Sequence, residues 1–173
     1  MKVIGIVGSI RENSIHRMIF NAYKELSSDE FELIEGEIED IPMYRGKDDE
    51  PTVSKLAEKI KGADAVIFFS PEYNYSVSGV LKNTLDFLSR QDPQPLSGKK
   101  AAIIGASPGG IGSARMQHHL RQIGVFLNLH FLNKPEVMIG NAMDKLKDGK
   151  LTDQETREFL KKHAKSFKEF VNS

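Results

Sequence analysis

Three stretches of the chain are almost continuously apolar and rich in β-branched residues: Lys2 to Gly8, Ala65 to Ser70 and Lys100 to Ala106. Strands of a parallel sheet that are covered on both faces have this composition, whereas half-exposed strands alternate apolar and polar residues. We therefore expect these stretches to form central strands. Two shorter apolar stretches, Phe31 to Glu35 and roughly Leu127 to Leu132, predict two further strands.

Between the strands, apolar residues recur at the three- and four-residue spacing of amphipathic helices. The pattern predicts one helix over Ser14 to Leu26, a second that ends before Gly62, and a third whose apolar face runs from Val80 to Leu88. Because strands and helices alternate along the chain, we expect an open α/β sheet with helices on both faces.

The last two predicted helices carry recognisable end signals. The fourth helix, which includes Leu120, is predicted to end at Gly124, since glycine favours the C-terminal cap. The fifth opens with the sequence TDQE, in which Thr152 and Glu155 have the spacing of a capping box. A chain of 173 residues with five strands and five helices is most simply one domain, residues 1–173.

The composition argues against several kinds of function. The chain has 24 Lys and Arg residues against 24 Asp and Glu residues, so no overall charge attracts it to nucleic acid or to a membrane. It has no cysteine, which removes thiolate catalysis, disulfides and most structural zinc sites. No apolar run approaches the roughly 20 residues of a membrane span, and charged residues interrupt the N-terminal apolar stretch before any signal cleavage site. We expect a cytoplasmic protein without nucleic-acid or membrane partners.

Open α/β sheets bind ligands beyond the carboxyl ends of their strands, at the point where the strand order reverses. Three loops in such positions have unusual sequences: GSIRENS after the first strand, SPEYNYSVSG after the third and SPGGIGSARMQ after the fourth. The chain has neither the glycine spacing of the dinucleotide-binding turn nor a P-loop sequence. Any phosphate must therefore be bound by a loop of another design.

The first loop has the chemical character of a phosphate-binding loop. Arg11 carries a planar guanidinium group, and Ser9 and Ser14 carry hydroxyl groups. A helix begins directly after the loop, and its free backbone N–H groups and dipole favour an anion. A purely structural interpretation is also open, in which Ser14 or Asn13 caps the helix and Arg11 is a solvated surface residue.

The second loop begins with Pro71, which fixes φ and turns the chain out of the strand, so that residues 72–74 should cross the top of the sheet. Tyr73 and Tyr75 offer flat faces to a planar ligand, but they could equally pack beneath the loop or against another subunit. Glu72 could equally be a surface carboxylate. In a ligand-binding loop, we expect its backbone path to matter more than its charge.

The third loop has four glycines in the eight residues from Gly105 to Gly112, directly before a predicted helix. Glycines permit a close approach of the backbone to a ligand, although they also form ordinary turns. The position of this loop beside the other two favours the first interpretation.

Taken together and in this order, GSIRENS, SPEYNYSVSGVLKNTLDFLSR and GASPGGIGSARMQ resemble the NADPH-dependent FMN reductase family. This flavodoxin-like group includes bacterial quinone, azo-dye and chromate reductases, and the resemblance covers about residues 2 to 125. It implies a three-layer sandwich with a five-stranded parallel sheet in the order 2-1-3-4-5. It also implies non-covalently bound FMN, NAD(P)H as co-substrate, and a homodimer or homotetramer with the flavin near a subunit interface.

The resemblance assigns cofactor-binding residues to all three loops. They are Ser9, Arg11, Asn13 and Ser14 for the FMN phosphate, Pro71, Glu72, Tyr73 and Asn74 along the isoalloxazine ring, and Ser107, Gly109 and Gly110 at its other edge. Two departures from the family pattern are visible. Ser78 stands where the family commonly has proline, which should loosen the turn into the next helix, and Phe87 stands where it commonly has tryptophan.

The implied function is an FMN-dependent NAD(P)H oxidoreductase. It would pass hydride from NAD(P)H through FMN to a small-molecule acceptor such as a quinone, free flavin, azo compound or chromate, by a ping-pong mechanism. Because the cofactor carries the chemistry, we expect no catalytic side chain. We also expect no metal site, since the neighbouring residues His118 and His119 diverge on a helix.

Two alternatives remain open from the sequence. One is a flavodoxin-type electron carrier, although such carriers are usually strongly acidic and bind phosphate without arginine. The other is a non-catalytic flavin-binding sensor. A phospho-acceptor signalling domain is disfavoured, because it would need acidic residues where this chain reads GSIRE and SPEYN.

Overall fold

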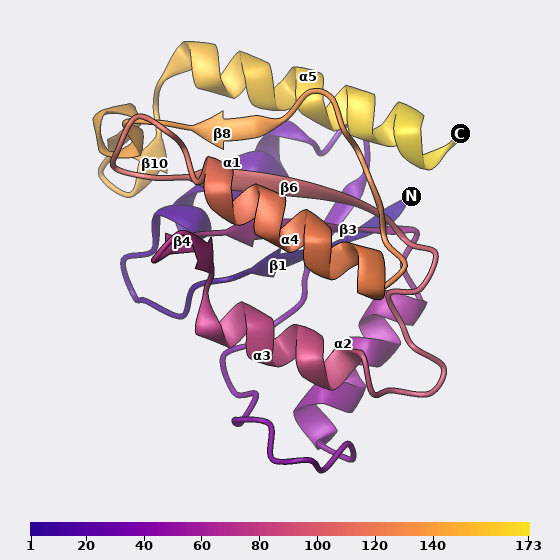
Figure 1. Cartoon of the computed structure of the whole chain (residues 1–173). Coiled ribbons are helices and arrows are strands. Elements are labelled where there is room, and N and C mark those ends of the chain that lie inside the picture. Colours follow the sequence, from indigo (N-terminus) through magenta and orange to yellow (C-terminus); the bar gives the residue numbers. More distant parts are fainter.

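A parallel sheet runs through the centre of the molecule, and the computed structural model describes all 173 residues (Figure 1). Its strands are β1 (Lys2–Val7), β2 (Glu32–Glu35), β3 (Ala65–Ser70), β6 (Lys100–Ala106), β7 (His130–Phe131) and β8 (Val137–Ile139). The order is β2-β1-β3-β6-β7, with β8 also paired to β6. Since β7 and β8 share the position beyond β6, this is the flavodoxin-like order 2-1-3-4-5. The predicted fold class is confirmed.

The strand at the β7 and β8 edge is the part of the sheet that the prediction described poorly. Leu127 belongs to the end of a helix, and the strand begins at His130. After Phe131 the strand is interrupted, and it resumes as β8, opposite residues 104–106 of β6. The intervening sequence is polar and contains Pro135, which has no N–H to donate to the ladder. Because of this interruption, the pattern of apolar residues did not predict that the strand resumes as β8.

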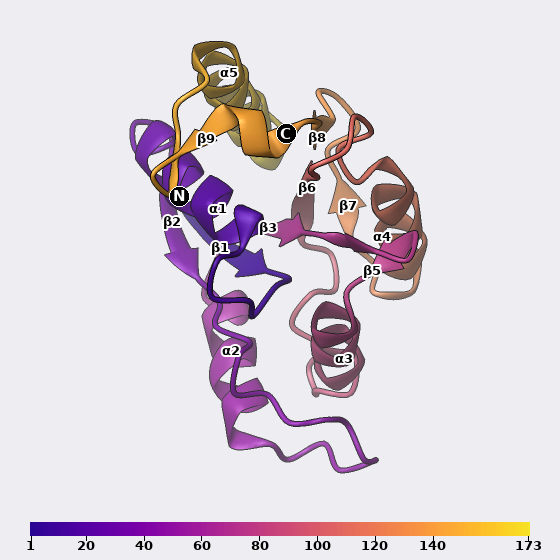
Figure 2. The same cartoon turned by 90° about the vertical axis from the view of Figure 1, so that its left-hand side faces the viewer.

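Five helices cover the two faces of the sheet (Figures 1 and 2). They are α1 (Ile15–Leu26), α2 (Pro51–Lys61), α3 (Gly79–Leu88), α4 (Ala114–Phe126) and α5 (Gln154–Val171). Apolar residues of α1 and α5 pack with the sheet in one buried cluster, and those of α2, α3 and α4 pack with it in a second. None of the helices combines the length and the apolar character needed to cross a bilayer.

Short elements complete the chain. They are the hairpin of β4 (Glu72–Tyr73) and β5 (Ser76–Val77), the 3₁₀ helix η1 (Ala142–Lys145), and the hairpin of β9 (Leu146–Lys147) and β10 (Lys150–Leu151). The first hairpin lies beside α4 at the carboxyl ends of the strands, as both views show (Figures 1 and 2).

Gly124 does not end α4, contrary to the prediction. The helix continues to Phe126, and Leu127 is its C-terminal cap. A Cβ atom on Gly124 would lie only 2.2 Å from Cε2 of Phe131. The glycine is therefore required for the close approach of α4 to β7. In the sequence, a glycine needed for this contact cannot be distinguished from a glycine that caps a helix.

The N-terminal cap of α5 lies one residue later than predicted. Asp153, not Thr152, caps the helix, and its side chain accepts a hydrogen bond of 3.0 Å from the backbone N–H of Thr156. Hydrogen bonds from the Thr156 side chain and backbone are the main reason why the pKa of Asp153 is lowered to about 2.

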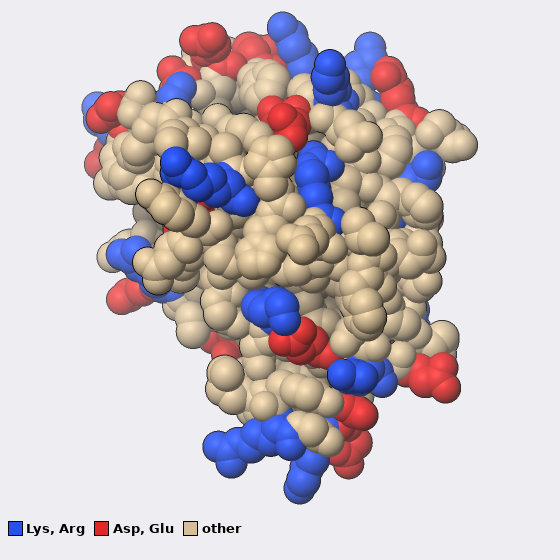
Figure 3. Space-filling view, in the orientation of Figure 1, with Lys and Arg blue, Asp and Glu red and all other residues tan.

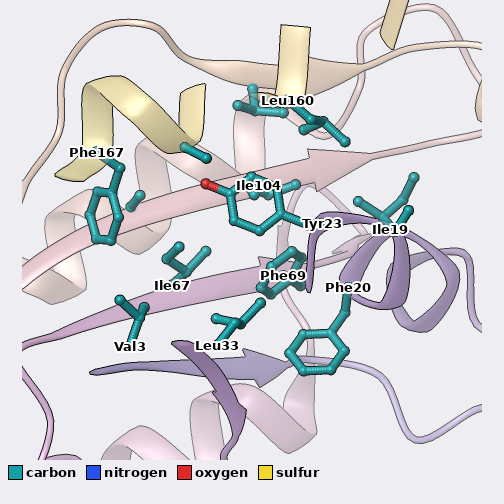
Figure 4. Close-up of a cluster of buried hydrophobic side chains, with 14 of the residues drawn as sticks. Val3, Ile19, Phe20, Tyr23, Leu33, Ile67, Phe69, Ile104, Leu160 and Phe167 are labelled. Atoms are coloured by element: carbon teal, nitrogen blue, oxygen red, sulfur yellow. The ribbon is translucent and has the colours of Figure 1, made fainter. Parts of the chain in front are cut away.

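Aromatic side chains fill the core between the sheet and the α1–α5 layer (Figure 4). Phe69 of β3 lies at the centre, with the ring of Phe20 at 5.2 Å and that of Tyr23 at 5.7 Å, both in edge-to-face arrangements. Edge-to-face pairs contribute about 0.5–1.5 kcal/mol beyond the burial of their area. Packing of α1 against β3 therefore holds the start of α1 over the carboxyl ends of the strands.

Tyr23 also joins α1 to α5 through a buried polar pair. Its hydroxyl group and Nδ1 of His163 are 2.8 Å apart, and both side chains are almost completely buried. Burial lowers the pKa of His163 to about 4, because the imidazolium form would lose its hydration. The folded protein therefore holds a neutral imidazole here.

His163 should make folding stability depend on pH between about 6.5 and 4. In this window the unfolded chain binds a proton at His163 that the folded chain does not, so stability falls as pH falls, by up to about 1.4 kcal/mol per pH unit. His163→Gln keeps a partner for the Tyr23 hydroxyl but cannot titrate. Urea unfolding at pH 7, 6 and 5 should show a shallower loss of stability in this variant. A slope equal to that of the wild type would contradict the assignment.

Candidate active site

The three loops expected to bind the cofactor meet at one cavity of about 350 Å³, beyond the carboxyl ends of β1, β3 and β6. Eight of the eleven predicted site residues line it: Ser9, Arg11, Asn13, Ser14, Pro71, Glu72, Tyr73 and Ser107. The other three, Asn74, Gly109 and Gly110, are exposed in the same loops but do not line the cavity. Figure 2, which faces these strand ends, shows the loops converging.

The first loop presents hydroxyl groups and a free cation at the start of α1. Ser9 and Ser14 are buried, and their hydroxyl groups accept hydrogen bonds of 3.4 Å from the backbone N–H groups of Arg11 and Arg17. Ser14 is thus the N-terminal cap of α1, as the structural interpretation allowed. Arg11 is exposed, and it is not among the arginines that form ion pairs, which are Arg17, Arg121 and Arg157. The combination leaves a cation beside a helix N-terminus, which favours an anion.

His16 lines the cavity, and the sequence analysis did not select it. Its Nε2 atom accepts a hydrogen bond of 3.1 Å from the backbone N–H of Ala106, at the end of β6. Burial lowers the pKa of His16 to about 4, against a smaller opposing effect from a hydrogen bond with the Ser70 backbone. The neutral ring therefore ties the start of α1 to the end of β6. Its spacing from the buried residues Phe20 and Tyr23 already placed it on the core face of the predicted helix.

The second loop folds into the β4–β5 hairpin with a two-residue turn at Asn74 and Tyr75, whose φ angles are 51° and 65°. Glu72 is half-buried at its base, and its Oε2 atom accepts a hydrogen bond of 3.0 Å from the backbone N–H of Met116. Ser113, the residue that precedes α4, makes no capping hydrogen bond with its side chain. Glu72 therefore caps α4 from another loop. Besides its backbone path, Glu72 thus has a side-chain role in the fold that the sequence did not indicate.

Ser78 strengthens the turn into α3, where the sequence predicted a looser one. Its buried hydroxyl donates a hydrogen bond of 2.6 Å to the carbonyl of Gly8 and accepts one of 3.3 Å from the N–H of Leu81. It thus caps α3 and fixes the first loop at the same time. Phe87 is buried and packs edge-to-face on Tyr44, with ring centroids 4.9 Å apart.

The third loop is held by hydrogen bonds within the loop and by close packing against β8. The hydroxyl of Ser107 donates to the carbonyl of Gly109 (2.8 Å) and accepts from the N–H of Gly112 (3.1 Å). Gly112 has φ of 65°, and a Cβ atom there would lie 2.4 Å from the carbonyl carbon of Met138. Gly112 is therefore required by packing, whereas a Cβ atom added to Gly109 or Gly110 would enter open space. These two glycines leave the outer part of the loop accessible to a ligand.

Met143 of η1 completes the cavity from a segment to which the sequence analysis assigned no role. Its side chain is 58% exposed and lines the cavity together with Pro108 and Ile15. These residues add apolar surface to a cavity that is otherwise polar on the side of the first loop. No three His, Cys, Asp or Glu side chains are grouped as a metal site would require.

Removal of the Glu72 carboxylate should destabilise the hairpin and α4 together. Glu72→Ala leaves the N–H of Met116 without its partner, and loss of such a cap typically costs about 0.5–2 kcal/mol. Glu72→Gln keeps an acceptor oxygen and should lose less. Urea unfolding provides the measurement, with Glu12→Ala, an exposed carboxylate of the first loop, as the control. Equal stability of Glu72→Ala and Glu12→Ala would show that the cap contributes nothing.

Comparison with known proteins agrees with the fold and identifies the family. A family model described as NADPH-dependent FMN reductase matches residues 1–144. An NAD(P)H-dependent FMN reductase of Pseudomonas aeruginosa is 42% identical over 176 residues, which cover 99% of this chain and 95% of that protein. The quinone reductase of Escherichia coli K12 is 40% identical over 179 residues, with coverage of 99% and 95%.

Among solved structures, the flavoenzyme NAD(P)H:(acceptor) oxidoreductase FerB of Paracoccus denitrificans superposes with a TM-score of 0.89 and 32% identity, covering 99% of this chain and 97% of that one. All three relatives are named as enzymes. Their names favour an FMN-dependent oxidoreductase that uses NAD(P)H over a simple electron carrier. By its sequence and its fold, the chain belongs to the NADPH-dependent FMN reductase family.

Proposed function

We propose that this enzyme binds FMN in the three-loop cavity and reduces a small-molecule acceptor, such as a quinone, free flavin, azo compound or chromate, at the expense of NAD(P)H. The observation that carries the proposal is the convergence of the three loops on one cavity at the carboxyl ends of the central strands. Its volume of about 350 Å³ lies within the range of about 300–1,000 Å³ for small-molecule sites.

The donors present fit the phosphate of FMN. Arg11 would pair with the phosphate through charge-assisted hydrogen bonds, and Ser9, Asn13 and Ser14 surround the same end of the cavity. The start of α1 adds backbone N–H groups there. Because Ser14 already accepts from the N–H of Arg17, its hydroxyl hydrogen remains available to a phosphate oxygen.

The opposite side of the cavity fits a planar ring. Pro71, Glu72 and Tyr73 form one wall, Ser107 contributes to the other, and Met143 adds an apolar surface. We propose that Asn74, Gly109 and Gly110 contact the outer edge of the ring through their backbone, because all three are exposed in the same loops.

When bound, FMN supplies a ring that accepts hydride and passes it to the acceptor. The side chains of this chain bind and orient, and we assign none of them as catalytic. His16 and Glu72 hold the loops through backbone N–H groups, and Ser9 and Arg11 bind phosphate. The three loops share one cavity, so we propose that NAD(P)H and the acceptor occupy it in turn, which gives ping-pong kinetics.

The enzyme is proposed to act as a homodimer or homotetramer. Val125 and Phe126 at the end of α4 are 81% and 79% exposed, which is unusual for large apolar residues. Figure 3 shows a broad area without charged side chains across the part of this face where α4 runs. We propose the cytoplasm as the location, where NAD(P)H is available, with small molecules rather than nucleic acid or membrane as partners.

The spectrum and kinetics of the purified protein test the function. We expect a yellow protein that takes up FMN, oxidises NAD(P)H without a separate reductase, and gives parallel double-reciprocal lines with a quinone acceptor. Intersecting lines would exclude the ping-pong mechanism. A colourless protein that does not take up added FMN would exclude the function.

Arg11→Ala tests the phosphate site. Loss of the charge-assisted hydrogen bonds should weaken FMN binding about 10- to 100-fold, while the exposed position of Arg11 should leave the Tm unchanged. Fluorescence titration with FMN measures the first quantity and thermal unfolding of the apoprotein the second. Arg45→Ala, in the exposed loop before α2, is the matched control. Equal FMN affinity in the two variants would remove Arg11 from the site.

A further inference from the structure

The tip of the β4–β5 hairpin holds a tyrosine in an unfavourable backbone conformation. Tyr75 has φ of 65°, in the second position of a two-residue turn that normally carries glycine. Non-glycine residues rarely adopt such angles, and the strain is concentrated at functional sites. The side chain is 67% exposed, so burial in a core does not explain it.

Tyr75 serves as a platform for Arg115. The guanidinium carbon of Arg115 lies 4.1 Å from the centroid of the Tyr75 ring, a cation–π contact at close range. Arg115 is exposed in the first turn of α4 and is not among Arg17, Arg121 and Arg157, the arginines that form ion pairs. Its charge is therefore held in place but not neutralised.

Two further contacts fix the hairpin to α4 on either side of this pair. Glu72 accepts from the N–H of Met116, and the hydroxyl of Ser76 and Nδ1 of His119 are 2.7 Å apart. Glu72 and Tyr73 of the same hairpin line the cavity. Arg115 is therefore a preorganised cation next to the hairpin that lines the proposed flavin site. Figure 2 shows this hairpin beside α4.

A hydride donor of the NAD(P)H type brings two negative charges to this rim. Its nicotinamide must lie against the flavin ring, so its diphosphate and adenosine must leave the cavity across one of the surrounding loops. Arg11 faces the proposed FMN phosphate. Arg45 and Lys47 line a separate cavity beside Phe87, together with Asp49 and Glu50, which offset their charge. Arg90, which also forms no ion pair, follows the far end of α3. Arg115, in the first turn of α4, is the unpaired guanidinium group that contacts the hairpin lining the cavity.

We propose that Arg115 binds the diphosphate of NAD(P)H, with Tyr75 holding the plane of the guanidinium group. The proposal rests on the proposed function, because it takes the flavin to lie in the three-loop cavity. Arginine suits this task, since its planar fork can donate two parallel hydrogen bonds to phosphate oxygens while one face stacks on an aromatic ring. NADH and NADPH share the diphosphate, so the contact should serve both.

The test compares hydride donors with and without the diphosphate. For Arg115→Ala loaded with FMN, the KM values for NADPH and NADH should rise by the same factor, about 10- to 100-fold. The donor 1-benzyl-1,4-dihydronicotinamide carries no phosphate. The ratio of kcat/KM for NADPH to that for the benzyl donor should therefore fall by the same factor. Arg115→Lys keeps the charge without the fork and should lie between.

The outcomes separate the alternatives. An unchanged ratio overturns the proposal, and so does a rise of KM for NADPH alone, which would assign Arg115 to the 2′-phosphate. Lys162→Ala, an exposed cation on α5 at the opposite face of the sheet, is the control and should keep the wild-type ratio. Failure of the proposed function would look different, because the wild type itself would not bind FMN or oxidise any of the donors.

Tyr75→Gly distinguishes binding from a structural role of the pair. Glycine relieves the backbone strain, so the Tm should stay equal or rise, while the loss of the platform should raise the KM for NADPH several-fold. Tyr75→Phe keeps the ring and should change neither quantity. A lower Tm with an unchanged KM in Tyr75→Gly would overturn the role of Tyr75.

Discussion

Backbone groups that leave a buried parallel sheet must find new hydrogen-bond partners, and this requirement shapes the site. Where β1 and β6 end, side chains from other segments supply the partners. Ser78 donates to the carbonyl of Gly8, His16 accepts from the N–H of Ala106, and Ser113 donates to the Ala106 carbonyl. Each of these hydrogen bonds connects a strand end to another segment of the chain. The same bonds that pair the backbone groups at the strand ends therefore also assemble the cavity. Unpaired buried groups would cost about 1–3 kcal/mol each.

The loop between β3 and α3 depends on contacts with α4 as well as on its own hairpin pairing. Glu72 caps α4, which lacks a capping side chain at Ser113. In return, α4 supports a hairpin whose turn contains two residues in the left-handed region. The contacts with α4 offset the strain at Tyr75 and hold the hairpin, with the cation of Arg115, in a fixed position beside the cavity. Preorganisation of this kind reduces the entropy lost when a ligand binds.

Two neutral imidazoles, those of His16 and His163, connect α1 to the rest of the molecule. His16 joins its first turn to β6, and His163 of α5 joins Tyr23 in its middle. Because burial lowers the pKa of each to about 4, both links persist at neutral pH, and their hydrogen bonds to uncharged partners suit the unprotonated ring. The N-terminus of α1, where the proposed phosphate site lies, is thus oriented by contacts of this helix with the sheet and with α5.

The sequence by itself determined the central strands, the helices on both faces and the three loops that line the candidate site. These features are local: continuous apolar runs, helical periodicity and short motifs are properties of neighbouring residues, and eight of the eleven expected residues line one cavity. Only the tertiary structure decided what depends on contacts between distant segments. Gly124 looked like a cap but permits the packing of Phe131, and Glu72 looked like part of a backbone path but caps a helix 44 residues away. His16 and Arg115 gained their positions from β6 and from the hairpin, and no spacing within the chain reveals which backbone group or ring will lie beside a side chain after folding.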